Sequence, residues 1–522
     1  MLPIFFISCK KEPKLAPSVV VSPAPIPVPV PTATSSELTK DSIFLYAKEV
    51  YYWNDDLPSY ETFNPRKYTS GATDLSNYNQ VLFNISQIKI NPLTSKPFEF
   101  LTAGSSKYSY IKDKTTKNPT AYIPHQQSSV DLEGNGNDMG LSFSAIGTTS
   151  SFDVRVKYSS PGSPADKAGL ERGDLVSKFN NTTVGTNFDT ESSVIENAIA
   201  GNTVVLGGKK KDGTLFSITL TKSLYKSSPI YKDTVITSSG KKVGYLAYAR
   251  FSNHANSEAA LNQVFSKFAA ANVTELVIDL RYNGGGYVSL AEHLTNLIAP
   301  SSLNGKLMFK EKFNELMQSG KATILKNQPL LDGNGKVRFS GSRMLTYLDI
   351  DYSEAENTFK FQKEGTLEGV QNVIFIITRS SASASELVIN NLKPHMNVKL
   401  VGQTSYGKPI GFFPITVENR YDVYYSMFTS INSNGQTDYF AGFTPDALTK
   451  DDVTQGFGDP KELSFAAALA YLTKGSFTAT TASVAKVSVK GASVSSSSVQ
   501  VRDIAEDNSF KGMVETRFKL RK

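Results

Sequence analysis

The sequence predicts a multidomain α+β fold with a helical N-terminal domain, a β-rich domain and a layered α/β domain of alternating strands and helices. Three observations support this prediction. The chain has 522 residues, more than one compact core accommodates. Apolar residues recur at helical spacing near its start, and short β-rich runs broken by glycine follow. From about residue 230, strand patterns alternate with helix patterns, as in a layered α/β domain.

The charge and the scarce residue types exclude several classes of function. The net charge of +7 is spread along the chain and forms no basic patch, so we expect no nucleic-acid binding. The one cysteine, Cys9, excludes a disulfide framework, thiolate zinc sites and a cysteine nucleophile in the folded body. The four histidines form no HExxH pair, so no zinc protease is indicated. Hydrolytic chemistry would have to use Ser, Lys, Asp or Glu.

Residues 1–9 form a short apolar run that ends in a small residue before Cys9. The run resembles the end of a bacterial lipoprotein signal, which implies lipidation of Cys9 and a lipid-anchored, periplasmic or extracytoplasmic place in the cell envelope. The alternative is an incidental thiol in a frayed terminus. Residues 10–36 alternate Pro with Val, Ala, Ser and Thr, which is typical of an extended linker. No other stretch has the roughly eighteen apolar residues of a transmembrane helix.

Residues 37–125 are expected to form a small, mostly helical domain. Thr39 and Asp41 are interpreted as its start signal, and apolar residues then recur at helical spacing: Ile43, Ala47, Val50 and Trp53. A second helical run follows through Leu75, Tyr78, Leu82 and Ile85.

Residues 126–228 contain two segments that resemble a PDZ domain of the bacterial protease type. They are the tetrapeptide Gly140, Leu141, Ser142, Phe143 and the run from Ser163 to Val176, SPADKAGLERGDLV. In that family the first segment offers N–H groups to the terminal carboxylate of a peptide, which adds a strand to the sheet edge. The resemblance therefore implies that residues 140–143 bind C-terminal tails. An unrelated β domain with turn glycines is the alternative.

Residues 229–475 are expected to form the layered domain, and its first strand-to-helix junction carries three glycines. The strand Leu276–Leu280 enters a loop that ends in Gly284, Gly285 and Gly286, and a helix follows at Val288–Ile298. Such glycines let backbone N–H groups face open space at a helix start, which suits a phosphate or an oxyanion. No Gly-Lys-Ser/Thr follows, so this is not a Walker loop.

The second junction places small residues before a helix that runs to Leu392. The strand that begins at Val373 leads into Ser-Ala-Ser-Ala-Ser, residues 381–385, which leaves room for a substrate beside a hydroxyl. A helix N-cap accounts for Ser385, but it does not explain why alanines alternate with three serines. The less regular stretch at 300–370 separates the two junctions, and we assign no chemistry to the Ser/Val-rich tail at 476–522.

A serine nucleophile needs a base, and the histidines are poorly placed in the sequence. His395 follows a proline at a helix exit, and His293 lies within a predicted helix. A lysine can serve if burial lowers its pKa from about 10.4 towards about 7–8, so that the neutral amine accepts a proton. Lys408 follows a short strand and a glycine. Taken alone, such a lysine is more often a solvated loop residue.

Three segments together resemble the carboxyl-terminal processing peptidases, also called tail-specific proteases. They are Asp279–Gly286, Ser381–Glu386 and Val401–Lys408, and they occur in that family's order and spacing. These peptidases carry a PDZ domain and a Ser-Lys dyad, and the resemblance implies a crotonase/Clp-like layered fold for the third domain. The resemblance extends over residues 37–475.

The resemblance also assigns roles to individual residues. Ser383 corresponds to the nucleophile and Lys408 to the general base. The oxyanion hole is expected to combine the N–H groups of Ala384 and Gly285, with Gly286 as a neighbouring alternative. Two further matches, Asp279 and Arg281, are interpreted as structural charges that hold the glycine loop.

One position departs from the family pattern. Many relatives have a glutamine four residues after the lysine, where this chain has Phe412, so the group that orients the dyad is unidentified. Because the dyad is intact, we expect a serine endopeptidase that recognises exposed apolar C-termini and requires no metal or organic cofactor. The alternative is a catalytically inactive PDZ-containing peptide-binding or scaffold protein. A penicillin-binding Ser-x-x-Lys enzyme is a third possibility, but neither Ser223–Lys226 nor Ser483–Lys486 begins a convincing buried helix.

Overall fold

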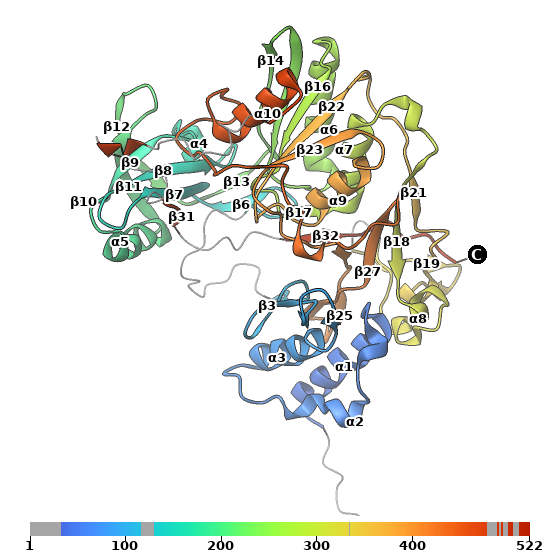
Figure 1. Cartoon of the computed structure of the whole chain (residues 1–522). Helices are drawn as coiled ribbons and strands as arrows, with labels where there is room; N and C mark the ends of the chain where they lie inside the picture. The colour runs from blue at the N-terminus through green and yellow to red at the C-terminus, as the bar shows by residue number, and fades with distance from the viewer. Residues whose placement is uncertain are drawn as a thin grey trace, which may run out of the picture.

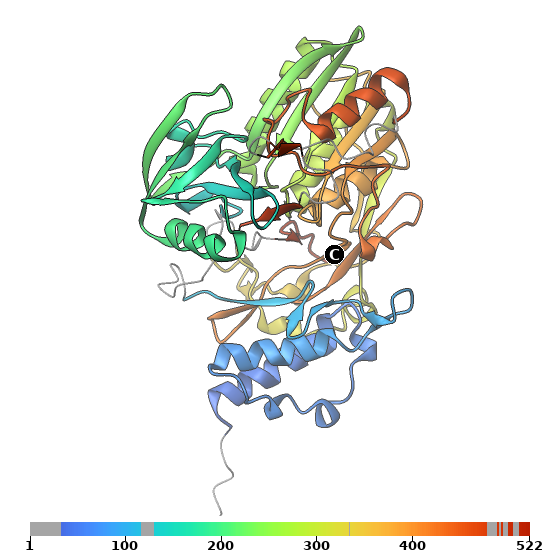
Figure 2. The ribbon, with the colours of Figure 1, turned by 60° about the vertical axis from the view of Figure 1, so that its left-hand side comes forward.

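The computed structural model describes residues 33–115, 130–332 and 335–477, and short segments of the tail at 488–489, 492–493, 500–504 and 511–521. Cys9 and almost all of the predicted linker lie outside these residues. None of the helices in the described part of the chain is long and apolar enough to cross a membrane. In both views of the ribbon, the N-terminal helices and the β-rich domain lie on different sides of the layered domain (Figures 1 and 2).

The N-terminal region begins with two packed helices, α1 (Ser35–Val50) and α3 (Asp74–Ser86). The helical runs predicted there are confirmed, but the start is not where we expected it. Thr34 caps α1 in a capping box with Glu37, so the helix begins within the predicted linker. Thr39 and Asp41 lie inside the helix, where Asp41 pairs with Arg66. Short helical turns connect the two helices: η1 (Asn54–Asp56), α2 (Tyr60–Phe63) and η2 (Pro65–Lys67).

Beyond Ser86 the expectation of a mostly helical domain is wrong, because the chain there forms short strands. They are β1 (Ile90–Asn91), β2 (Lys96–Pro97), β3 (Phe100–Thr102), β4 (Ser105–Ser106) and β5 (Tyr110–Asp113). β5 pairs with β26 (Tyr421–Tyr424), which also pairs with β25 (Ile415–Val417). A non-local pairing of this kind leaves no helical or turn signal in the local sequence, and it joins the N-terminal region to the layered domain.

The β-rich domain has its own hydrophobic core. Its main sheet has the order β12-β11-β9-β8-β7-β31. The elements are β6 (Asn135–Asp138), β7 (Leu141–Gly147), β8 (Phe152–Ser159), α4 (Pro164–Lys167), β9 (Leu175–Phe179), β10 (Thr182–Thr183), α5 (Phe188–Ala200), β11 (Thr203–Lys209), β12 (Leu215–Thr221) and β13 (Ser223–Lys226). The last strand of the sheet, β31 (Gln500–Asp503), comes from the C-terminal tail.

The layered domain is built on a six-stranded sheet of order β14-β15-β16-β22-β23-β28, parallel from β15 onward. Helices α6, α7 and α9 cover one face and α10 covers the other (Figure 1). The elements are β14 (Ile230–Ser238), β15 (Lys241–Tyr248), α6 (His254–Ala270), β16 (Glu275–Asp279), β17 (Gly285–Tyr287), α7 (Val288–Ile298), β22 (Asn372–Ile377), α9 (Ala384–Leu392), β23 (Asn397–Gly402), β28 (Ala447–Leu448) and α10 (Leu463–Lys474). The predicted strands and helices of this domain are confirmed to within a few residues.

The irregular stretch at 300–370 contributes to a second sheet of order β21-β18-β27-β24. Its strands are β18 (Leu307–Phe313), β21 (Thr358–Lys360), β24 (Ile410–Gly411) and β27 (Phe428–Asn432). Shorter elements of the stretch are η3 (Ser301–Leu303), α8 (Glu315–Gln318), η4 (Thr323–Asn327), β19 (Phe339–Ser340), β20 (Arg343–Met344) and η5 (Tyr347–Asp349). Asn314 donates to the carbonyl oxygens of Glu49 and Tyr51, which fastens this sheet to α1.

Candidate active site

Ser383 lies between β22 and α9, at the carboxyl edge of the parallel strands. Its φ is 60° and its ψ is −107°, a backbone conformation that residues with a side chain rarely adopt. The side chain is fully buried, and its Oγ has no hydrogen-bond partner among the described residues. A strained turn that presents a hydroxyl at a helix N-terminus is the geometry in which hydrolases hold a nucleophilic serine.

Lys408 follows β23 and is 1% exposed. Burial lowers the pKa of its amine from the usual 10.5 to about 7. The Nζ lies 4.4 Å from the centre of the Phe412 ring and donates to the carbonyl oxygens of Lys511, at 2.8 Å, and Tyr108, at 3.4 Å. A lysine with this pKa is about half neutral at pH 7 and can therefore accept a proton.

Ser383 and Lys408 are not hydrogen-bonded to each other in this structure. The hydroxyl is unpartnered, and the amine donates to two backbone carbonyls instead. A neutral amine that donates to two carbonyls still has a lone pair for the Ser383 proton, so the expected dyad requires the amine and the hydroxyl to come within hydrogen-bond distance.

Glu386 holds the two predicted catalytic loops together. Its fully buried carboxylate accepts from the N–H groups of Ser383, at 2.9 Å, Gly407, at 2.7 Å, and Lys408, at 2.8 Å. It also accepts from the Ser405 hydroxyl. No role was predicted for Glu386 from the sequence. The sequence feature that could have indicated a role is the position of this glutamate, three residues after Ser383 at the start of a helix. This is the N3 position of a capping box.

The glycine loop lies against the N-terminus of α9. Gly285 has a φ of 106°, and a Cβ there would stand 3.0 Å from the amide nitrogen of Ala384. Gly286 has a φ of 140°, and a Cβ there would stand 2.0 Å from the carbonyl oxygen of Phe251. Only glycine fits either position, and at Gly285 this is because the loop lies close to the start of α9.

The expected oxyanion hole is only partly formed. Ala384 is the first residue of α9, so its N–H belongs to the helix N-terminal donors that have no acceptor within the helix. The N–H of Gly285, by contrast, donates to Oδ1 of Asn283 at 2.9 Å. In this conformation the Gly285 N–H is therefore not free, because the Asn283 side chain folds back on the loop.

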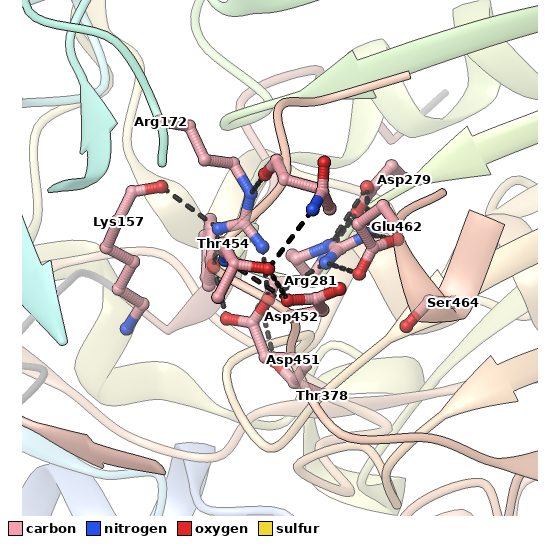
Figure 3. A network of polar contacts seen from close by, with 12 residues as sticks. Lys157, Arg172, Asp279, Arg281, Thr378, Asp451, Asp452, Thr454, Glu462 and Ser464 are labelled. Atoms are coloured by element: carbon pink, nitrogen blue, oxygen red, sulfur yellow. Dashed lines mark hydrogen bonds and ion pairs between the residues drawn. The ribbon is translucent and has the colours of Figure 1, made fainter. Parts of the chain in front are cut away.

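A buried network of charges fixes the glycine loop to the rest of the molecule (Figure 3). Arg281 pairs with Asp279 at 2.8 Å, with Asp451 at 2.9 Å and with Glu462 at 2.8 Å. Arg172, from the β-rich domain, pairs with the same Asp451 at 2.5 Å. The prediction that Asp279 and Arg281 are structural charges agrees with this arrangement. The network also ties the β-rich domain to the loop through Asp451, a contact between distant segments that the sequence does not predict.

The predicted peptide-binding segment forms the turn into β7. Gly140 has a φ of 74°, and a Cβ there would lie 2.0 Å from the Cβ of Ser163. Its N–H donates to Oδ1 of Asp138 at 2.7 Å. Along β7, which continues through Leu141, Ser142 and Phe143, one edge pairs with β8 and the other with β31.

None of the described histidines is hydrogen-bonded to the Ser383 hydroxyl. His254 bonds to Glu258 and Ser289, and His293 bonds to Glu364. His395 bonds to Ser433 and the Leu307 carbonyl. In the described ranges, no group of three or more His, Cys, Asp or Glu side chains is placed to hold a metal ion.

Two parts of the chain match known protein families. Residues 242–449 match the profile of peptidase family S41, and residues 155–204 match that of a PDZ domain. The chain is 22% identical over 267 residues to the chloroplastic C-terminal processing peptidase of Tetradesmus obliquus, covering 49% of this chain and 48% of the relative. It is 24% identical over 295 residues to the carboxyl-terminal-processing protease of a Picosynechococcus strain, covering 55% of this chain and 58% of the relative. The chain thus spans about half the length of the curated relatives it matches.

One solved structure shares the fold over most of the chain. It is a crystal structure reported as that of an S41 protease from Bacteroides fragilis, with a TM-score of 0.53 and 20% identity, which covers 83% of this chain and 97% of that chain. At this identity the likeness supports the multidomain α+β fold alone.

Proposed function

Because the chain belongs to the carboxyl-terminal processing peptidases of family S41, we propose that it is a serine endopeptidase in which Ser383 and Lys408 cleave protein substrates through an acyl-enzyme. The observation that carries this proposal is the pairing of a strained, unpartnered serine with a buried amine whose pKa is about 7, on two loops joined by Glu386. The strained backbone at Ser383 and the buried amine of Lys408 both lower the stability of the fold. Neither therefore has an evident structural purpose.

In the proposed mechanism, neutral Lys408 takes the proton of the Ser383 hydroxyl while Oγ attacks the peptide carbonyl. The Ala384 N–H and a glycine N–H of the 284–286 loop stabilise the tetrahedral oxyanion. Either Gly285 exchanges its bond to Asn283 for the oxyanion, or the neighbouring Gly286 supplies the donor. Protonated Lys408 then gives its proton to the leaving amine, and water, activated by the same lysine, hydrolyses the acyl-enzyme.

The PDZ domain is proposed to select substrates by their exposed apolar C-termini. An extended tail would add a strand to the edge of β7, with its end at residues 140–143. We also propose that lipidation of Cys9 holds the enzyme in the cell envelope. Replacement of Cys9 by Ala should then release the protein from the membrane fraction, and unchanged fractionation would contradict the anchor.

The test of the catalytic proposal is cleavage of a peptide with an apolar C-terminus by Ser383→Ala and Lys408→Ala variants. Both should lose at least about a thousandfold in kcat/KM, as expected for groups that act as one catalytic unit. Lys393→Ala, which removes an exposed lysine beyond α9, serves as the control and should retain activity. Undiminished cleavage by either catalytic variant would reject the dyad.

The second candidate is a catalytically inactive PDZ-containing peptide-binding or scaffold protein. The missing hydrogen bond between Ser383 and Lys408 favours it. Labelling with a fluorophosphonate probe separates the two, because an active serine becomes covalently modified at Ser383 and a scaffold does not.

A further inference from the structure

The C-terminal tail of the chain occupies the PDZ edge at which a peptide is expected to bind. β31 pairs antiparallel with β7, in a register that runs from Gln500 opposite Gly147 to Asp503 opposite Ser144. As the tail advances, its partner residues on β7 therefore move back towards the turn at 140–143. This is the direction in which a C-terminal peptide would approach that turn.

The residue after β31 is buried in the PDZ core. The N–H of Ile504 faces the carbonyl oxygen of Phe143 at 3.4 Å, and the side chain is 1% exposed. Ile504 packs in the same hydrophobic core as Leu141 and Phe143. A branched apolar side chain thus fills the place where the terminal residue of an apolar tail is expected.

A second part of the tail crosses the candidate active site. β32 (Gly512–Val514) pairs in parallel with β17, so that Gly512 lies opposite Gly285. On its other side, the carbonyl oxygen of Met513 accepts from the N–H of Phe412 at 3.1 Å. The tail is therefore hydrogen-bonded on both edges, like a strand inserted between the glycine loop and the lysine loop, and Met513 is fully buried.

The inserted strand also engages the predicted catalytic groups. The carbonyl oxygen of Lys511 accepts from Nζ of Lys408 at 2.8 Å, while Oγ of Ser383 stays unpartnered. A Cβ on Gly285 would lie 2.5 Å from the carbonyl oxygen of Gly512, so the tail backbone is in contact with the glycine loop. With the tail in place, the lysine amine is bonded to the tail, and the tail pairs with both β17 and Phe412, where a substrate strand would otherwise pair.

We infer that residues 500–504 and 511–514 are an intramolecular ligand that fills the PDZ edge and the active site together and keeps the enzyme inactive until the tail is displaced. The inference rests on the proposed function for its inhibitory part. A protein substrate must compete with the tail at both places. The peptide that displaces the tail is an extended segment with a branched apolar residue. It would run along β7 towards residues 140–143.

The experiment compares the full chain with Ile504→Asp, which places a charge in the PDZ core, and with the matched control Ile504→Val, which keeps an apolar branched side chain. Fluorophosphonate labelling of Ser383 should be about tenfold faster or more in Ile504→Asp, because the open population rises. The Ile504→Val variant keeps most of the buried apolar surface and should therefore label much more slowly than Ile504→Asp. A synthetic peptide with the sequence of residues 500–515 should slow the labelling of Ile504→Asp, and the same peptide with the Ile replaced by Asp should not.

Hydrogen exchange provides a readout that does not require activity. Peptides covering β7 and residues 511–514 should be protected in the full chain and should exchange faster in Ile504→Asp, with α7 as an unaffected internal reference. Fast exchange of both segments in the unmodified chain would overturn the docking of the tail. Equal labelling of all three proteins, with Ser383 reactive, would overturn inhibition while the proposed function stands. If Ser383 is unreactive in every variant, the proposed function fails, and exchange alone decides whether the tail is bound.

Discussion

The amine of Lys408 lies 4.4 Å from the centre of the Phe412 ring. Phe412 is fully buried, and the Tyr108 ring lies 5.6 Å from the same amine. The position where many relatives carry an orienting glutamine is thus filled by an aromatic ring that excludes water from the lysine. This exclusion accounts for the lowered pKa of Lys408, because desolvation disfavours the charged form of an amine.

The first prediction concerns the pH dependence of cleavage. Burial lowers the pKa of Lys408 to about 7, and only the neutral amine can act as the base. The value of kcat/KM should therefore rise about tenfold per pH unit below pH 7 and level off above about pH 8. The check is a pH profile of peptide cleavage between about pH 5.5 and 9. A profile that is flat across neutral pH would contradict the assignment of Lys408 as the base.

The second prediction tests the part that Phe412 plays in setting the lysine pKa. Phe412→Gln places a carbonyl oxygen near the amine and stabilises the protonated form, so the pKa of Lys408 should rise by about one unit. The midpoint of the pH profile should move by that amount to higher pH, and activity at pH 7 should fall. Phe412→Leu keeps the site apolar and is the control with an unshifted midpoint. An unshifted midpoint in Phe412→Gln would show that the ring does not control the pKa.

The sequence predicted those parts of the fold and site that local signals specify. The helix at Val288–Ile298 was predicted with the bounds it has, because a buried strand, a glycine loop and a helical pattern follow one another without interruption. Ser383 and Lys408 could be named because the segments that carry them resemble those of a known family in order and spacing. Their burial, and hence the lowered pKa, depends on rings such as Tyr108 that lie far away in the chain.

The parts that were missed depend on long-range pairing. The tail of Ser, Thr and Val carries no local signal for its partners, yet β31 pairs with β7 more than three hundred residues earlier. For the same reason the strand β5 was predicted as part of a helical domain. The role of Glu386 was visible only as a capping position, since three of the four groups it accepts from lie on the loop around Gly407.

The third prediction concerns the Glu386 carboxylate, which accepts hydrogen bonds from both the serine loop and the lysine loop and is called the Glu386 clamp below. A glutamine at this position keeps one acceptor oxygen and turns an NH₂ group towards buried N–H donors. About two buried donors would lose their acceptor, at a cost of roughly 1–3 kcal/mol each. Glu386→Gln should therefore unfold at lower denaturant concentration and lose about a hundredfold or more in kcat, because the serine and lysine loops move apart.

The control for the clamp is Glu171→Gln, which changes a glutamate whose side chain is 74% exposed. It should leave both the unfolding midpoint and kcat unchanged. Full activity of Glu386→Gln would mean that the two loops are held in place without the carboxylate.

The fourth prediction concerns two neighbouring carboxylates beneath the tail. Glu311, on β18, is fully buried, and neither of its oxygens has a hydrogen-bond partner in the described part of the chain. Burial and the nearby Glu515 of the tail raise the pKa of Glu311 well above its usual value, while Arg517 opposes this rise and Glu292 adds to it. Glu515 itself pairs with Arg517 at 3.0 Å.

The raised pKa makes the stability of the folded protein depend on pH. Between the unfolded pKa of Glu311, about 4.5, and its higher folded pKa, the folded protein holds a proton that the unfolded chain has lost. The free energy of unfolding should therefore fall as pH rises through this window, by about 1.4 kcal/mol per unit, and level off above the folded pKa. Glu311→Gln removes the titrating group, so its stability should lack this slope and exceed that of the unmodified chain at alkaline pH.

Urea unfolding at a series of pH values measures the slope and the stability at alkaline pH. The control is Glu354→Gln, at a half-exposed ion pair with Lys310, which should keep the slope. The same slope in Glu311→Gln would show that Glu311 is not the group whose raised pKa causes it.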